Sequence, residues 1–365
     1  MTRTPRIARS VVTGLVATAV ASAGLLTAGA GAANAEGIPS GHAWVNPIPA
    51  HVYSPYFEAY NGDNPATLSA ESGSKYLTFA FIETAASGSC TAYWNGDTTQ
   101  PLTSATFGSS IAAIQRSGGT VIPSFGGYGA DTTNTDIADS CTNVDDIAKV
   151  YENVFTTYHA SRIDLDVEAT SLSNTAGITR RNQAIAETEA WGLRTGHPVS
   201  FQYTLPSATT GLGATGLAVL QNAVQEHAKI ALVNAMTFDY YIGTTQEMGT
   251  DAVTAANGVF SQLSALYPWK SKAQIWESIG LTLMPGIDDF GAAETTTAAD
   301  VNTVESFAKG HGLGALSIWA IQRDNGGCPG TSGAGTCSGV VQNTWDFSHI
   351  LEKFNSPSWG NGWGF

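Results

Sequence analysis

Three acidic residues alternate with apolar residues in one short segment of the chain. In residues 161–168, SRIDLDVE, the acids are Asp164, Asp166 and Glu168. A β-strand has a side-chain period of two, so this spacing places the three carboxylates on one face, ~6.7 Å apart along the strand. Neighbouring carboxylates cannot all ionise easily, which raises at least one pKa and yields a protonated acid near neutral pH. The segment therefore predicts general acid–base chemistry.

Strand-like apolar runs and amphipathic stretches alternate along most of the chain. The expected strands are residues 52–56, 76–82, 120–125, 162–167, 199–205, 232–238, 279–284 and 315–321. The expected helices are residues 107–116, 144–158, 179–194, 252–266 and 298–311. Eight strands separated by helices predict an α/β protein, and more specifically a single-domain (β/α)8 TIM barrel, which takes ~250 residues as one unit.

A barrel would also explain why the acidic segment is functional. The interior of a barrel is packed with side chains, and burying ionised carboxylates there costs several kcal/mol per charge unless they share protons or bind a ligand. Glu168 ends its strand at the carboxyl end, where barrel enzymes place their chemistry. We therefore interpret the three acids as catalytic, not as the solvated face of an ordinary strand.

The composition argues against several other functions. The 365 residues include 16 Lys+Arg and 30 Asp+Glu, a formal net charge of −14, and no basic run. Such a chain has no electrostatic surface for nucleic acid or anionic membranes. The 7 histidines are scattered and none pairs at metal-ligand spacing. No G-x-G-x-x-G loop follows the first strand. We expect no metal, no cofactor, no nucleic acid and no membrane partner.

The first 35 residues have the pattern of a secretory signal peptide. Three arginines precede the uncharged residues 11–30, and residues 33–35, Ala-Asn-Ala, fit a cleavage site. A retained membrane anchor is the alternative, because the apolar run is near spanning length. We expect secretion of a chain that has a short segment over residues 36–50, the barrel over residues 51–355, and a Gly/Trp tail over residues 356–365.

An even number of cysteines in an exported chain indicates disulfides. Cys328 and Cys337 enclose a glycine-rich loop that a bond between them would pin, and this pairing leaves Cys90 with Cys141. A zinc site is the alternative, but the cysteines lack C-x-x-C spacing.

Several motifs, in the chain order of the barrel strands, resemble glycoside hydrolase family 18, the chitinases and their relatives. Residues 164–168 resemble the end of the family's D-x-x-D-x-D-x-E signature. Residues 124–127 (SFGG), 204–206 (TLP) and 236–239 (MTFD) are similar to the ends of its third, fifth and sixth strands, and Trp319 matches its eighth-strand tryptophan. Further details, such as residues 283–285 (LMP), resemble the bacterial chitinases. The resemblance covers residues 50–355.

Two positions depart from the family's pattern. Ser161 stands where the signature usually begins with Asp, and Phe238 stands where many members have Tyr. We expect the first change to tune activity without abolishing it. The second removes a hydroxyl that helps to hold the substrate, and the residues considered as replacements are Tyr203, Tyr240, Tyr241 and Gln202.

The resemblance implies retaining hydrolysis of β-1,4-linked N-acetylglucosamine by substrate-assisted catalysis. Glu168 would be the general acid and base, Asp166 would hold the acetamido group of the sugar, and Asp164 would orient Asp166. The residues expected to contact the sugar are Trp319, Asp239, Tyr241, Tyr203, Gln202, Met236, Tyr240 and Trp94. The expected partner is chitin or an N-acetylglucosamine oligosaccharide, bound by a monomer.

Two alternatives fit the same barrel. One is an endo-β-N-acetylglucosaminidase that cuts N-glycan cores with the same acid. The other is a catalytically silent chitin-binding lectin, against which Glu168 argues because such proteins usually lose the acid.

Overall fold

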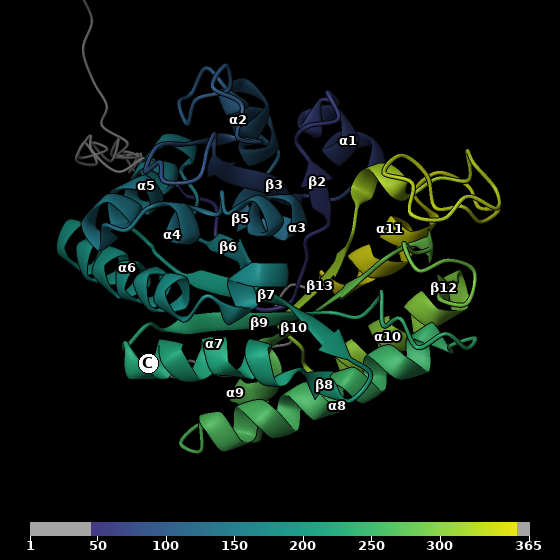
Figure 1. Ribbon diagram of the computed structural model, residues 1–365. Helices are drawn as coiled ribbons and strands as arrows, with labels where there is room; N and C mark the ends of the chain where they lie inside the picture. Colours follow the sequence, from purple (N-terminus) through teal and green to yellow (C-terminus); the bar gives the residue numbers. More distant parts are fainter. Residues whose placement is uncertain (1–44, 356–365) are drawn as a thin grey trace, which may run out of the picture. The chain divides into compact units, whose positions relative to one another are not determined.

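The computed structural model describes residues 45–355 of the chain, in which parallel strands form one closed sheet (Figure 1). The sheet has eight strand positions, called staves below, and β1 and β2 together make up the first of them. The sheet order is β1-β13-β10-β9-β7-β6-β5-β3-β2. The strands are β1 Val52–Tyr53, β2 Tyr56–Glu58, β3 Tyr76–Thr84, β5 Thr120–Gly126, β6 Ile163–Asp166, β7 Phe201–Ala208, β9 Ile230–Met236, β10 Ile279–Leu283 and β13 Ala315–Ile318. The expected signal peptide and the Gly/Trp tail lie outside the described residues.

The first stave closes the barrel because it consists of two short strands. Residues 52–56 were expected to form one strand, but β1 pairs with β13 and β2 pairs with β3. Pro55 lies between them and has no N–H for a ladder. The Ser54 N–H bonds the Leu316 carbonyl on one side, and the Pro55 carbonyl accepts the Thr78 N–H on the other. The predicted (β/α)8 barrel is confirmed.

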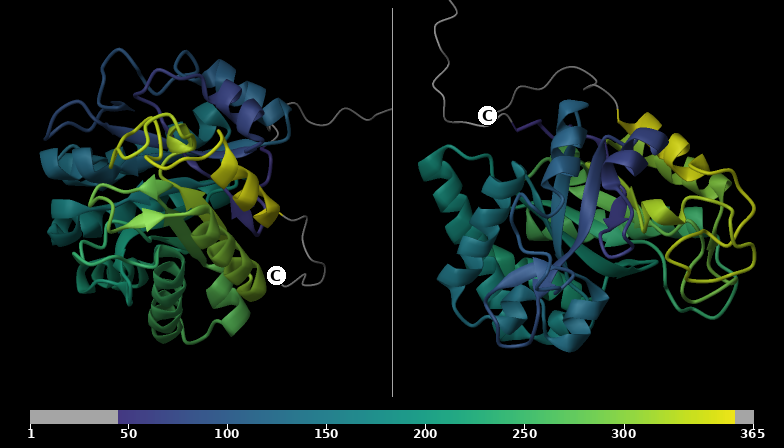
Figure 2. Two further views of the ribbon diagram at one scale, coloured as in Figure 1. Left: turned by 90° about the vertical axis from the view of Figure 1, so that its right-hand side faces the viewer. Right: turned by 90° about the horizontal axis from the view of Figure 1, so that it is seen from above.

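One helix follows each stave, and the views in Figure 2 show these helices outside the strands. They are α1 Pro65–Ser72, α2 Gly108–Arg116, α5 Val144–Tyr158, α6 Thr175–Thr195, α7 Ala214–Gln225, α8 Met248–Leu266, α10 Ala298–His311 and α11 Asp346–Leu351. The ends of α5 and α10 were predicted correctly because local capping fixes them: Asn143 caps α5, and Thr297 forms a capping box with Asp300. No helix among the described residues is long and apolar enough to cross a membrane.

Shorter elements lie in the loops. They are the strands β4 Ala92–Trp94, β8 Gly211–Leu212, β11 Gly286–Ile287 and β12 Thr295–Thr296, the helices α3 Gly127–Thr133, α4 Ile137–Ser140 and α9 Lys272–Glu277, and the 3-10 turns η1 Ala169–Ser173, η2 Ile321–Arg323 and η3 Glu352–Phe354. Of these, α3, α4 and η1 bear on the site because they follow the carboxyl ends of β5 and β6.

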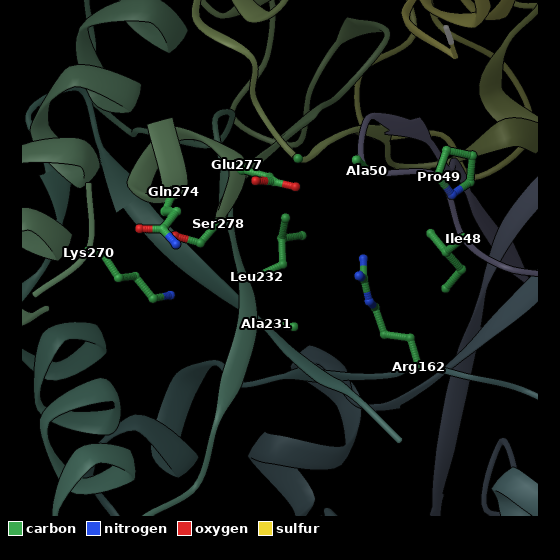
Figure 3. Close-up of a pocket in the computed structure, with 11 residues that line it drawn as sticks. Ile48, Pro49, Ala50, Arg162, Ala231, Leu232, Lys270, Gln274, Glu277 and Ser278 are labelled. Atoms are coloured by element: carbon green, nitrogen blue, oxygen red, sulfur yellow. The ribbon is translucent and has the colours of Figure 1, made fainter. Parts of the chain in front are cut away.

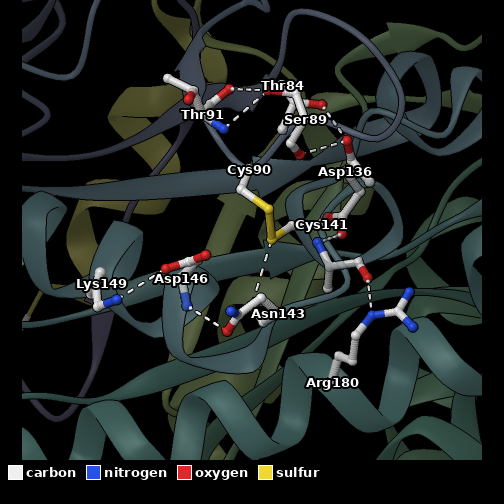
Figure 4. The surroundings of a disulfide bond; sticks show 12 residues. Thr84, Ser89, Cys90, Thr91, Asp136, Cys141, Asn143, Asp146, Lys149 and Arg180 are labelled. Carbon is white, nitrogen blue, oxygen red and sulfur yellow. Dashed lines mark hydrogen bonds and ion pairs between the residues drawn. A yellow bond between two sulfur atoms is a disulfide. The ribbon is translucent and has the colours of Figure 1, made fainter.

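Both expected disulfides are present, Cys90–Cys141 and Cys328–Cys337. Cys90 precedes β4 and Cys141 follows α4, so the first bond joins the loops that follow β3 and β5 (Figure 4). Beside it, the Ser140 hydroxyl donates to the Ser89 carbonyl at 2.8 Å. The bond therefore stabilises the position of α4 above the third stave.

The alternation in β6 is as predicted. Ile163 and Leu165 belong to the apolar core between strands and helices, whereas Asp164 and Asp166 are buried on the opposite face. Tyr56 reaches Asp164 from β2, which is three staves away in the sheet. The acids of β6 therefore face the barrel axis.

Candidate active site

Asp164 is the most fully hydrogen-bonded of the three acids. Its Oδ2 accepts the Ser124 hydroxyl at 2.6 Å and the Tyr56 hydroxyl at 3.0 Å. Its Oδ1 accepts the Thr204 hydroxyl at 2.7 Å and the Gln202 amide at 2.9 Å. Burial raises the pKa of Asp164, and these four hydrogen bonds oppose that rise because they stabilise the anion.

Asp166, unlike Asp164, has an oxygen without a hydrogen-bond partner among the described residues. It is buried and lines a cleft, and no described residue forms a hydrogen bond to its Oδ1. Burial raises the pKa of Asp166 well above its usual range, and the charges of Glu168 and Asp164 raise it further. Asp166 therefore retains a proton more readily than Asp164, and its carboxyl group lines the cleft.

Glu168 follows directly after the strand. It caps η1, with its backbone in an extended conformation. The Glu168 N–H donates to a side-chain carboxyl oxygen of Asp131. Burial raises the pKa of Glu168 to about 7, a backbone hydrogen bond from Tyr128 opposes the rise, and the charges of Asp239 and Asp289 add to it. Glu168 can therefore both donate and accept a proton near neutral pH.

Asp166 and Glu168 line a cleft of about 930 Å³ at the carboxyl ends of the strands, and Asp164 is buried behind it. Trp319, after β13, stacks on Phe81 with ring centroids 5.5 Å apart and meets Tyr56 edge-on at 5.4 Å. Tyr60, Tyr128 and Tyr241 also line the cleft, and each is more than half exposed. Flat aromatic surfaces beside polar groups suit a ligand such as a sugar, which has apolar faces and polar edges.

Of the residues expected to contact a sugar, Trp319, Asp239, Tyr241 and Met236 line the cleft. Asp239 Oδ1 accepts the backbone N–H of Asp289 at 3.0 Å, and the Asp239 N–H donates to Asp288 at 3.0 Å. Burial, together with the charge of Asp289, raises the pKa of Asp239 to about 6. Of the four replacements considered for the tyrosine missing at Phe238, only Tyr241 lines the cleft.

The other four expected contact residues do not line the cleft. Gln202 is buried and donates its side-chain amide N–H to Oδ1 of Asp164 at 2.9 Å. Tyr203 is buried on the helix side, where its hydroxyl donates to Asn182 at 2.6 Å, because it alternates with Gln202 and Thr204 along β7.

Tyr240 and Trp94 are the remaining two. The Tyr240 backbone N–H donates to Glu294, which lies on the loop between β10 and α10, at 2.6 Å. Trp94 is in the core, where its indole N–H donates to the Tyr158 hydroxyl at 2.8 Å. Trp94 faces the helices because β4 turns back antiparallel on β3, a pairing that gives no signal in the sequence.

Several residues that shape the site were not expected from the sequence. Tyr56 and Phe81 stand beside the acids, and Asp289 adds charge to the cleft. Tyr56 could have been recognised as the last polar aromatic residue of the first expected strand. Asp131 and Arg181, described below, have no local signal because only the tertiary fold brings them to β6.

A second cavity, of about 300 Å³, lies at the amino ends of the strands (Figure 3). Figure 3 shows Arg162 and Lys270 on either side of Leu232. Glu277 is the only carboxylate in its lining, so this cavity lacks the set of neighbouring acids that the cleft has. No group of three or more His, Cys, Asp or Glu within residues 45–355 is arranged to hold a metal ion.

The chain is similar to known chitinases. No protein-family model matches it. It is 32% identical over 286 residues to the probable bifunctional chitinase/lysozyme of Escherichia coli, and 32% identical over 288 residues to endochitinase 11 of Metarhizium anisopliae. Each match covers 76% of this chain but only 31% and 53%, respectively, of the two relatives.

The chain also matches almost the whole length of a solved chitinase domain. That domain is active domain 2 of a thermostable chitinase from Pyrococcus furiosus, in a catalytic-site mutant complexed with chito-oligosaccharides. The two chains are 29% identical with a TM-score of 0.75, and the match covers 85% of this chain and 96% of the other. The two chains therefore share the fold over most of their length.

Proposed function

Because the chain belongs to glycoside hydrolase family 18, the family of the chitinases that it matches, we propose that it is a chitinase that hydrolyses β-1,4-linked N-acetylglucosamine with retention. The observation that carries the proposal is the graded environment of three acids along β6 and at its end. Asp164 is fully hydrogen-bonded, Asp166 lines the cleft and has no hydrogen bond to its Oδ1 from the described residues, and Glu168 is half-buried with a pKa of about 7.

In the proposed mechanism, Glu168 protonates the glycosidic oxygen while the acetamido oxygen of the substrate attacks the anomeric carbon. Family 18 enzymes use this substrate assistance in place of a carboxylate nucleophile. The C–O bond to the leaving sugar breaks as the oxazolinium ring closes. The carboxyl group of Asp166, which lines the cleft, accepts the acetamido N–H. Glu168, now ionised, removes a proton from the water that opens the ring, which restores the acid and retains the configuration.

The cleft supports a sugar polymer as the substrate. Trp319 lines the same cleft as Asp166 and Glu168 and presents an apolar surface to one face of the sugar at the cleavage point. The exposed rings of Tyr60, Tyr128 and Tyr241 are placed to contact neighbouring sugar units. The relative from Pyrococcus furiosus was solved with chito-oligosaccharides, which supports the same class of ligand here.

The test is product analysis with purified protein that starts at Glu36. We expect short N-acetylglucosamine oligomers from a chitin hexamer by mass spectrometry, β-anomers as first products by NMR, and no requirement for added metal. Glu168→Gln should lower kcat by at least about 10²-fold, because general acid catalysis contributes that much. Glu71→Gln, on the exposed side of α1, is the matched control and should keep wild-type activity.

Each alternative gives a distinct result. Wild-type turnover by Glu168→Gln would contradict the mechanism. Binding to chitin without products would favour a lectin, and release of glycans from an N-glycoprotein, with an intact hexamer, would favour the endo-β-N-acetylglucosaminidase.

We also propose that the chain is exported and cleaved after Ala35, as its first residues suggest. N-terminal sequencing of the protein from the culture medium tests this proposal, and the expected first residue is Glu36. Intact Met1 on cell-associated protein would contradict it.

A further inference from the structure

The backbone of Glu168 is held by an element outside the barrel strands. The last residue of this segment with a ladder bond is Val167, whose N–H donates to the Thr204 carbonyl of β7. The next N–H, that of Glu168, donates instead to Oδ2 of Asp131 in α3. The pairing of β6 therefore does not fix the backbone of Glu168, and Asp131 supplies the contact that is missing.

Asp131 holds the chain on both sides of the turn. Its side chain accepts the Glu168 N–H, and its own backbone carbonyl accepts the Thr170 hydroxyl. Asp131 is fully buried and does not line the cleft, so it does not reach the position of a substrate. Its role is therefore to hold residues 168–170, not to contact a ligand.

Two glycines bring α3 into this position. Gly126 and Gly127 have φ of +92° and +83°, a region that side chains rarely adopt. A side chain on Gly126 would overlap the Asp166 carbonyl, and one on Gly127 would overlap the ring of Phe81. The chain can therefore turn from β5 into α3 directly against β6, which places Asp131 beside the end of that strand.

A buried ion-pair cluster supports the turn from the side of the helices. Arg181 of α6 lies 2.7 Å from Asp136 and 3.7 Å from Asp139, and all three are buried. Asp139 in turn accepts the hydroxyl of Ser171 in η1 and, at 2.9 Å, the amide of Asn174. Thus η1 is fixed by α3 at its start and by α4 at its middle and end.

From these contacts we propose that Asp131 is a positioning residue for Glu168, an inference that rests on the proposed function. By fixing the Glu168 N–H, Asp131 sets the direction in which the glutamate side chain leaves the backbone, and so the distance from its carboxyl group to the glycosidic oxygen. A misplacement of about 1 Å at such a group can cost about 10²-fold in rate.

The protonation state of Asp131 makes the proposal testable. Burial raises the pKa of Asp131 to about 9, the charge of Asp136 adds to the rise, and Arg181 opposes it. The titratable or charged groups that act on it, or that it acts on, are Asp136, Arg181, Asp166 and Glu168. At neutral pH the side chain is therefore an uncharged carboxyl group, for which asparagine is a close replacement that keeps an oxygen acceptor.

The experiment compares Asp131→Asn and Asp131→Ala with the wild type on a chitin hexamer. We expect Asp131→Ala to lower kcat by about 10- to 100-fold with KM within about twofold. Asp131→Asn should stay within about threefold of the wild-type kcat at pH 6, because its amide oxygen still accepts the Glu168 N–H. Asp324→Asn is the matched control: Asp324 is a buried carboxyl that accepts backbone N–H groups of α11, and this change should leave kcat unaltered.

The outcomes separate this inference from the proposed function. A wild type that does not cleave the hexamer would refute the proposed function. An active wild type with an equally active Asp131→Ala would refute the positioning role alone. Equal losses in Asp131→Asn and Asp131→Ala, with unfolding temperatures lowered in parallel, would show that the carboxyl serves only the fold and would also overturn the proposal. If Asp131→Ala does not fold, Asp131→Asn still tests the proposal, because a kcat lowered by much more than threefold in a folded Asp131→Asn would overturn it.

Discussion

Replacing Arg181 with methionine should destabilise the protein strongly. The Arg181 side chain is 0% exposed and is the cation for two buried carboxylates, at 2.7 Å and 3.7 Å. Methionine fills a similar volume but leaves Asp136 and Asp139 without a counter-charge. Breaking a buried ion pair by removing one partner typically costs about 3–5 kcal/mol. Since unfolding entropy is ~2.1 cal/mol/K per residue, a barrel of this size should lose about 5–8 °C in Tm.

The loss should also depend on pH in a defined direction. Burial raises the pKa of Asp139 in the wild type, and Arg181 opposes that rise. Without Arg181 the pKa of Asp139 rises further above its unfolded value, so the folded variant binds more protons than the unfolded chain does. Stability then increases as pH falls. We therefore expect a smaller difference between variant and wild type at pH 5 than at pH 8.

Urea unfolding at pH 5, 6.5 and 8, followed by tryptophan fluorescence with the disulfides intact, measures both effects. The neighbouring Arg180 provides a matched control. Its Nε donates to the Ala138 carbonyl at 2.9 Å but forms no ion pair within the described residues. Arg180→Met should cost about 1 kcal/mol, the net value of one hydrogen bond, with a weaker dependence on pH, because Arg180 lowers the pKa of Asp139 less than Arg181 does. An Arg181→Met variant no less stable than Arg180→Met, or a deficit that grows on acidification, would refute this account.

Two further predictions concern the cleft and the disulfides. Glu168 must be protonated to act as an acid and its pKa is about 7, so kcat/KM should fall as pH rises through that value. Asp289→Asn removes a charge that raises the pKa of Glu168 and should therefore move the alkaline limb of the pH–rate profile to lower pH. An unmoved or higher limb would argue against Glu168 as the acid. The Cys90–Cys141 bond spans 51 residues and Cys328–Cys337 spans 9, so replacing each pair with serine should cost about 4 and about 2.7 kcal/mol, respectively, in urea unfolding. The reverse order would show that chain entropy does not dominate.

The sequence predicted those parts of the fold that depend on local pattern. Alternation in residues 163–167 fixes which side chains of β6 face the axis, and caps at Asn143 and Thr297 fix the starts of α5 and α10. The helix α7 was missed because Gly213 stands at its N-cap and Gly216 lies in its first turn, and both weaken the helical pattern. The break in the first stave was missed because Pro55 lies inside a run that otherwise alternates like a strand.

The errors in the site have a related cause. The same period of two that placed Asp164 on the axis places Gln202 and Thr204 there too, so Tyr203 between them must face the helices. Tyr203 was thus predictable from the rule that had located the acids. Trp94 was not, because its orientation depends on β4 folding back on β3.

The pattern of residues 164–168 does not predict that the three acids have different hydrogen-bond partners. Those different surroundings are what assign a role to each acid. Equal spacing along a strand makes them look equivalent. The fold gives Asp164 four donors from three other strands, leaves one oxygen of Asp166 with none, and gives Glu168 a backbone contact on a helix. Hydrogen bonds favour a charged carboxylate and burial disfavours it, so charge is best stabilised at Asp164 and a proton at Asp166. The carboxyl group of Asp166, which lines the cleft, then becomes the site for a substrate donor, and Glu168, with a pKa of about 7, exchanges its proton at the end of the strand.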